Sequence, residues 1–204
     1  MKMKDMKINF IVERALALFT ARSINEVTVR DVADDAGVGE ATVYRYFSKK
    51  QNLVKAVAIK LQDEIFKGYF DLSAKKTGYD KIVGFYNIYY KIFNEHSEFY
   101  RFVNEFDAFC INENVSELDE YSAGLEQFKE KFLEAYEQGI KDGSVRRLDD
   151  ADTFYYATTH ALLNLCKKLT IKRDLVKQDL GVDKAKEVKT MVEVILGYCK
   201  NPQA

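Results

Sequence analysis

The sequence has few of the residues that interrupt helices. Of its 204 residues only one is proline, Pro202, and ten are glycine. Because proline breaks helices and glycine weakens them, their scarcity favours long helices throughout the chain. The three cysteines, Cys110, Cys166 and Cys199, are widely spaced and odd in number. This pattern argues against a disulfide framework and fits free thiols in a reducing compartment.

Long apolar runs are missing as well. None approaches the ~20 residues that a helix needs to cross a bilayer. The charged amino-terminal stretch MKMKDMKINF also lacks the apolar segment of a signal peptide. We therefore expect a cytoplasmic protein without a membrane partner.

Signatures of catalysis are scarce. The two histidines, His96 and His160, lie far apart in the sequence. No pair of His, Cys or Asp residues has the spacing of a metal-ligand motif, and there is no Gly-rich phosphate loop or Gly-x-Ser-x-Gly motif. The sequence therefore predicts no enzyme, no metal site and no cofactor.

What the sequence does contain is a helix-turn-helix pattern, TVRDVADDAGVGEATVYRYF, from Thr28 to Phe47. Thr28, with Asp31 three residues later, predicts a capped helix start. Gly37 predicts the positive φ that ends this helix, and a second short helix then runs from about Glu40 to Tyr46. The apolar residues expected to hold the two helices together are Val32, Ala33, Ala36, Val38, Val43 and Phe47.

The other face of the second helix is polar and aromatic, which suits contacts to phosphates and base edges. Ser48 and Gln51 form a second capping box, which predicts a third helix with Lys49 and Lys50 in its first turn, where free N–H groups also favour phosphate. A hairpin that only serves packing is the alternative. The residues of this polar face are Glu40, Ala41, Thr42, Tyr44, Arg45 and Tyr46.

Charge is distributed unevenly, although the net charge is only −1. Residues 1–60 hold eleven Lys/Arg and seven Asp/Glu, whereas the remainder holds twenty and twenty-five. A positive end on a negative body would orient the protein on DNA and keep the body away from it.

An amphipathic helix is predicted from about Met6 to Ala21, before the helix-turn-helix. Together with it, the segment from Thr28 through YRYFSKKQNL resembles the DNA-binding domain of the TetR family of bacterial transcriptional regulators. The resemblance covers about the first third of the chain. Gly39 and Glu40 depart from the residues usual in that family, which leaves the preferred DNA sequence open.

The resemblance implies specific roles at the DNA. Thr28, Tyr44, Tyr46 and Lys50 match positions that contact phosphate. From the residues of the exposed face we expect Thr42 and Glu40 near base edges and Ala41 on a thymine methyl. Arg30 and Arg45 are further candidates.

The rest of the chain is predicted to be helical too. A continuous helix over residues 49–70 would leave the helix-turn-helix domain (residues 1–48) and enter an effector-binding and dimerisation domain (residues 71–204). The segment DLSAKKTG, Asp71–Gly78, is the clearest linker. Further helices are expected after the linker, at about 79–94, 97–110, 119–142, 150–171 and 183–200. In total we expect an all-α fold of about nine helices.

Two adjacent helices, at 79–94 and 97–110, are rich in Tyr and Phe. Such a cluster can line a cavity for a flat, apolar or cationic small molecule, or it can simply form a large core. The TetR resemblance implies an effector pocket in this region. The residues we expect to line it are Tyr86, Tyr89, Tyr90, Phe93, Phe102, Phe106, Phe109, Phe128 and His160.

The last two helices are expected to pair with their copies across a two-fold axis, because the corresponding helices of TetR proteins form a four-helix bundle. Two recognition helices about one DNA turn apart would read a palindromic operator. Helices that only complete the monomer core are the alternative. The expected interface residues are Thr158, Leu162, Leu165, Met191, Val194, Ile195 and Tyr198.

The sequence therefore predicts a homodimeric DNA-binding regulator, a repressor released from its operator by a small apolar or aromatic effector. Two alternatives remain. One is a DNA-binding regulator controlled by a protein partner, with the aromatic residues as ordinary core. The other is an enzyme or carrier with a vestigial helix-turn-helix.

Overall fold

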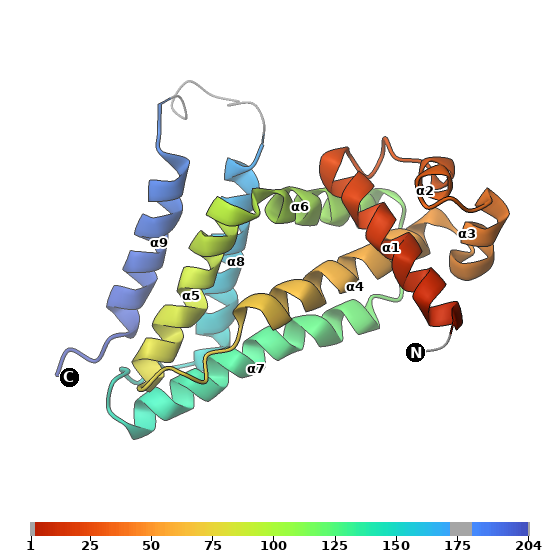
Figure 1. Cartoon of the computed structure of the whole chain (residues 1–204). Helices are drawn as coiled ribbons and strands as arrows, with labels where there is room; N and C mark the ends of the chain where they lie inside the picture. Colours follow the sequence, from red (N-terminus) through yellow and green to blue (C-terminus); the bar gives the residue numbers. More distant parts are fainter. Residues whose placement is uncertain (1–2, 172–180, 204) are drawn as a thin grey trace. The chain divides into compact units, whose positions relative to one another are not determined.

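The computed structural model describes residues 3–171 and 181–203, and over these ranges it is helical throughout (Figure 1). The described residues hold no strand and one isolated bridge, between Val145 and Lys200. The helices are α1 (Met3–Ala21), α2 (Val29–Asp35), α3 (Glu40–Phe47), α4 (Lys50–Tyr69), α5 (Gly78–Glu95), α6 (Ser97–Asn112), α7 (Asp119–Lys141), α8 (Ala151–Leu169) and α9 (Lys184–Cys199). The predicted all-α class is confirmed, and the described residues form nine helices, in line with the expected number.

The start of α4 differs from the expected capping box. Ser48 is instead the C-cap of α3, with a φ of 63°. The backbone N–H of Ser48 donates to the carbonyl of Tyr44 at 2.7 Å, so the Gln51 side chain does not accept from it, and the Gln51 amide donates to the carboxylate of Glu113 at 3.0 Å. The Ser-x-x-Gln spacing was misleading because the chain turns too tightly here for an extended N-cap residue.

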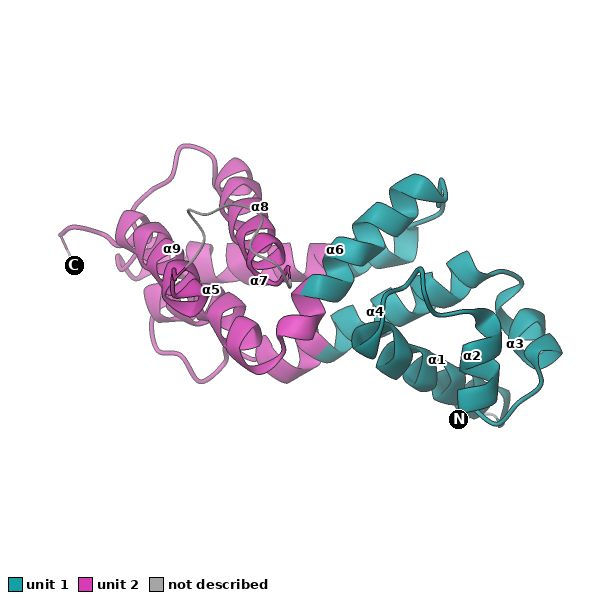
Figure 2. Ribbon diagram, turned by 90° about the horizontal axis from the view of Figure 1, so that it is seen from above, with its two compact units in different colours: residues 1–64, 101–124 teal, residues 65–100, 125–204 magenta. Residues whose placement is uncertain are grey.

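The chain forms two compact units (Figure 2). Unit 1 comprises residues 1–64 and 101–124, and unit 2 comprises residues 65–100 and 125–204. Helices α4, α6 and α7 each contribute residues to both. The expected first domain ended at residue 48, whereas unit 1 also takes in most of α4, the greater part of α6 and the start of α7.

Unit 1 has an aliphatic core closed by a few phenylalanines. Side chains from α1, α2 and α3 meet Leu53, Val54 and Val57 of α4, all three fully buried. Phe102, Phe106 and Phe109 of α6 complete this cluster. The core therefore fixes α2 and α3 against two longer helices.

Unit 2 is built around aromatic rings. Phe85 and Phe132 are fully buried, with ring centroids 5.7 Å apart and an edge-to-face orientation, and both lie near Tyr155. Helix α9 packs against α5 and α8. Edge-to-face ring pairs add to the stability that burial alone provides. No helix within the described residues is both long and apolar enough to cross a membrane.

Candidate nucleic-acid interface

Helix α2 begins and ends with the local signals that the sequence predicts. The Thr28 hydroxyl accepts from the backbone N–H of Asp31 at 3.1 Å, and the Asp31 carboxylate accepts from the N–H of Thr28 at 2.7 Å. These hydrogen bonds lower the pKa of Asp31. At the other end Gly37 has a φ of 64°, and the N–H of Val38 reaches back to the carbonyl of Ala33 at 2.9 Å. This Schellman geometry turns the chain directly into α3.

Helix α3 presents two different faces. Val43 and Phe47 are buried in the core of unit 1. On the opposite side Glu40, Ala41 and Arg45 are exposed, and Tyr44 leaves 44% of its surface to solvent. An amphipathic helix held from behind, with an outward row of polar and aromatic side chains, has the form of a recognition helix.

The junction between α3 and α4 fixes the direction of α3. The N–H of Lys49 donates to the carbonyl of Phe47 at 2.7 Å across Ser48, which forms a γ-turn. The side-chain amide of Asn52 donates to the same carbonyl at 2.8 Å. With no flexible linker between them, α3 cannot reorient independently of α4.

The structure separates the predicted contact residues by their accessibility. Arg30 is exposed, with its guanidinium 3.8 Å from the Asp34 carboxylate, and Thr28 is exposed although its hydroxyl serves the α2 cap. Thr42 and Tyr46 are half-buried, and Tyr46 lies under the Arg45 guanidinium at 5.1 Å. Accessible side chains on α3 therefore come mainly from its first turn and from Tyr44 and Arg45.

Lys50 has a different role from the expected phosphate contact. Its ammonium group donates to the carbonyl of Ile24 at 2.6 Å and lies 5.9 Å from the centre of the Phe109 ring. Burial lowers the pKa of Lys50. Lys50 therefore anchors the turn after α1, and its ammonium group is engaged within the chain. Lys49, its exposed neighbour, remains free to face solvent.

Helix α6 contributes polar contacts to unit 1 that sequence reasoning missed. The Glu105 carboxylate accepts from the backbone N–H of Ile24 at 2.9 Å, and Arg101 donates to the carbonyl of Thr20. Together with Lys50 these residues hold both sides of the turn after α1. The sequence signal was that Arg101 and Glu105 lie four positions apart on a helix rich in aromatic residues, a spacing that usually marks a solvated face.

Unit 1 as folded is less basic than its amino-terminal segment. Residues 1–64 and 101–124 hold twelve Lys/Arg and fifteen Asp/Glu, which gives −3. Part of this negative charge pairs with polar groups of α4, as at Gln51–Glu113 and Lys55–Glu117. The predicted positive end is therefore a property of the chain segment and does not describe the whole unit. Affinity for DNA must come from the local face of α3 and its flanks.

The nine expected pocket residues do not form one group. Phe102, Phe106 and Phe109 belong to the core of unit 1, whereas Tyr86, Tyr89, Tyr90, Phe93 and Phe128 belong to unit 2 or pack against its core. Within unit 2 the Tyr86 hydroxyl lies 2.7 Å from that of Thr158. His160 is exposed on α8, with its ring 5.7 Å from that of Tyr156.

The expected dimer residues also divide. Leu162 and Ile195 are buried in the core of unit 2, which leaves them little surface for a second chain. Val194 is 64% exposed and Tyr198 51% exposed on α9, and Leu165 and Met191 are half-buried at the edge of the core. Apolar residues recur every three or four positions on both the inner and the outer face of these helices. The spacing alone therefore could not show which face points inward.

Comparison with known proteins agrees with this architecture. Residues 11–57 match the family model described as bacterial regulatory proteins, tetR family. The HTH-type transcriptional repressor KstR2 of Rhodococcus jostii is 29% identical over 140 residues, which span 67% of this chain and 66% of the relative, slightly less than two thirds of its length. KstR2 of Mycobacterium tuberculosis is 24% identical over 147 residues, covering 71% of this chain and 72% of the relative.

Solved structures show the same fold. The ketosteroid transcriptional regulator KstR2 of Mycobacterium tuberculosis matches with a TM-score of 0.63 at 18% identity, over 95% of this chain and 94% of that one. The fatty acid degradation regulator FadR of Bacillus halodurans matches with a TM-score of 0.63 at 17% identity, over 93% and 94%. The helix-turn-helix geometry, the family model matched by residues 11–57 and these relatives agree: the amino-terminal helices are similar to those of bacterial regulatory proteins of the tetR family, and the chain shares the fold of solved members.

Proposed function

We propose that this protein is a sequence-specific DNA-binding transcriptional repressor that reads its operator with α3. The observation that carries the proposal is the two-faced α3: Val43 and Phe47 anchor it in the core, while Glu40, Tyr44 and Arg45 face outward. The two relatives named above as KstR2 are themselves repressors by name. A rigid, outward-facing helix of this composition suits the major groove.

For the interface itself, Glu40, Ala41 and Thr42 would lie near base edges, because residues at the start of a recognition helix reach deepest into the groove. Tyr44 and Arg45 would contact phosphate, with Thr28, Arg30 and Tyr46 flanking them. Glu40 can accept from a cytosine amino group, and it also repels misplaced phosphates. Specificity would thus depend on the first turn of α3.

The proposed active form is a homodimer that uses the outer surface of α8 and α9. Val194 and Tyr198 expose large apolar surfaces there, and contiguous apolar surface marks association sites. Two recognition helices related by a two-fold axis read a palindrome whose half-sites are about one DNA turn apart. The dimer would therefore set the half-site spacing, and α3 would set the sequence.

A small molecule bound in unit 2 would release the protein from its operator, so that repression responds to the concentration of that molecule. Control by a protein partner is the second candidate, because the Tyr86 and Tyr100 hydroxyls already have partners within the chain, Thr158 and the carbonyl of Tyr89. Rings whose polar groups are satisfied internally behave as ordinary core. The two candidates differ in whether a purified ligand alone can release DNA.

The test is selection of bound duplexes from a random library by the purified protein at two salt concentrations. An enriched palindrome with half-sites about one turn apart is the expected result. Weak binding that salt abolishes without any sequence preference would contradict the proposal, since non-specific binding is dominated by phosphate charge. The selected duplex then serves as the reporter for release by ligands.

A further inference from the structure

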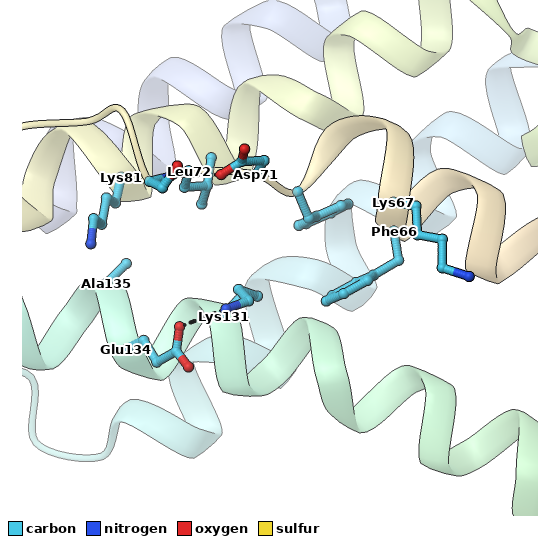
Figure 3. Close-up of a pocket in the computed structure, with 10 residues that line it drawn as sticks. Phe66, Lys67, Asp71, Leu72, Lys81, Lys131, Glu134 and Ala135 are labelled. Carbon is cyan, nitrogen blue, oxygen red and sulfur yellow. Dashed lines mark hydrogen bonds and ion pairs between the residues drawn. The ribbon is translucent and has the colours of Figure 1, made fainter.

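A cleft in unit 2 is lined by none of the nine residues that the sequence predicts for the pocket, although Phe128 packs against two of its lining rings. It encloses about 350 Å³ between the end of α4, the chain that follows it, α5 and α7 (Figure 3). This is within the range of sites for small molecules, about 300–1,000 Å³. Every residue that lines it belongs to unit 2.

One part of the lining is apolar and firmly held. Phe66 and Phe70 stack at 5.9 Å, and both rings meet Phe128 edge to face, at 5.2 and 4.7 Å. Leu72 and Ala135 are nearly fully buried beside them. A wall supported in this way needs little reordering to accept a flat apolar body, which keeps the entropic cost of binding low.

The other part of the lining is charged, with three lysines and two carboxylates. Both carboxylates have partners: Glu134 accepts from Lys131 at 2.9 Å, and Asp71 accepts from the backbone N–H of Ser73 at 3.0 Å. Lys81 has no carboxylate partner among the described residues, and in Figure 3 its side chain extends from α5 toward α7 on the Ala135 side. The cleft thus offers an unpaired cation and no unpaired anion.

From this arrangement we propose that the cleft binds a flat apolar carboxylate, with its anionic group on Lys81 and its body against Phe66 and Phe70. An organic cation would find both carboxylates engaged. An uncharged molecule would leave the Lys81 ammonium without a partner and would strip part of its water. A charge-assisted hydrogen bond to ammonium favours the carboxylate over its amide by about tenfold.

The cleft is lined in part by α4, a helix that also belongs to unit 1. Phe66 lies in the last turn of α4, and the same helix places Leu53 and Val57 in the core that holds α3. A ligand that favours one position of the end of α4 therefore acts on a helix shared with unit 1. If operator and ligand prefer different positions, each weakens the binding of the other by the same factor. This effector role rests on the proposed repressor function, whereas binding to the cleft does not.

The test uses 2-naphthoate, with 2-naphthamide as the uncharged analogue and inorganic phosphate as the anion without an apolar body. Binding to the full-length protein without DNA is measured by calorimetry. We expect naphthoate to bind about tenfold more tightly than naphthamide, and phosphate not to bind. Lys81→Gln should abolish this preference, and Lys141→Gln, which removes an exposed lysine of α7 outside the cleft, should keep it.

Equal binding of the acid and the amide would overturn the proposal, as would a preference that survives Lys81→Gln or no binding of naphthoate at millimolar concentration. Operator affinity of the ligand-free protein is measured separately on the selected duplex. If that duplex does not bind, the repressor function fails while the carboxylate site is still decided by calorimetry. If naphthoate binds as expected but leaves operator affinity unchanged, the effector role is overturned.

Discussion

The two units of this chain differ in the side chains that form their cores and their outer surfaces. The core of unit 1 is mostly aliphatic, with five buried phenylalanines, and the outer face of α3 carries polar and aromatic side chains. Lys50, Arg101 and Glu105 add charged contacts to the turn after α1. Unit 2 places its aromatic rings inside, where Phe85 and Phe132 meet edge to face. The two units differ most in the partly buried residues around each core, which are mainly aromatic in unit 2 and mainly aliphatic in unit 1.

Unit 1 also has a net negative charge, although it is the part proposed to bind DNA. Unit 1, the proposed DNA-binding part, carries −3 as folded, because acidic residues of α6 and the start of α7 join it. Glu105 of α6 accepts from the backbone N–H of Ile24, and Glu117, between α6 and α7, pairs with Lys55 of α4, so both carboxylates are structural. DNA binding by such a unit must be local, and it should be sensitive to a few residues of α3 and its flanks.

The largest expected effect tests whether the two cores are separate. Phe132→Ala and Phe106→Ala each remove a nearly fully buried ring, one from each unit, and should lower the free energy of unfolding by about 3–5 kcal/mol. Hydrogen exchange resolved by segment should show lost protection mainly in the unit that carries the change. Equal loss in both units would show that they unfold as a single body and would break the comparison.

The next effect concerns the surface of unit 1 alone. Tyr44→Ala removes an exposed contact and should weaken operator binding by about tenfold or more, while the melting temperature stays within about a degree of wild type. Leu125→Ala, which removes a similarly exposed large side chain on α7 outside the proposed DNA and dimer surfaces, is the control and should leave operator affinity unchanged. Unchanged operator affinity in Tyr44→Ala would contradict the assignment of α3.

A smaller effect is expected at the clamp from α6. Glu105→Ala leaves the N–H of buried Ile24 without its acceptor and should cost about 1–2 kcal/mol of unit 1 stability. Glu105→Gln keeps an acceptor oxygen and should cost less. Glu113→Gln, a change at an exposed position on the chain just after α6, controls for lost charge. If Glu105→Ala melts like wild type, the clamp does not stabilise the turn.

The smallest effect is a pH dependence in the cap of α2. The pKa of Asp31 is lowered by its hydrogen bonds to Thr28, so the folded state holds its proton less tightly than the unfolded state does. The cap therefore stabilises unit 1 fully above the ordinary pKa of aspartate, and this contribution is lost as the pH falls through the lowered value. In acid titrations monitored by circular dichroism, Asp31→Asn should lose less stability than wild type over this range. Identical acid curves would show that the cap does not contribute.

Much of this fold could be predicted from the sequence, because its signals are local. The Thr28–Asp31 box, the positive φ of Gly37 and the apolar period of each helix depend on neighbours within four residues, and most helix bounds were predicted to within a few residues. Ser48 was misread because the same residue types occur at a helix start and in a tight turn. Helical termini are decided by the path of the chain as well as by composition.

The site was harder to predict because its long-range contacts leave no local pattern. That Lys50 binds the carbonyl of Ile24, and that Phe102 and Phe106 serve unit 1, follow from packing between segments far apart in the sequence. Leu162 and Ile195 share a helical period with residues that face outward, so periodicity could not separate inner from outer faces. The cleft beside Phe66 combines four segments and could not be seen in any one of them.

The central claim is that the first turn of α3 reads base edges. It is tested most directly by repeating the duplex selection with Glu40→Gln, which keeps the size of the side chain and replaces an acceptor carboxylate by an amide. We expect a palindrome with the same half-site spacing but a changed base preference at one position in each half-site, because the amide can donate as well as accept. An unchanged consensus would contradict the claim that Glu40 reads a base. A changed spacing would mean that the substitution acts through the arrangement of the dimer.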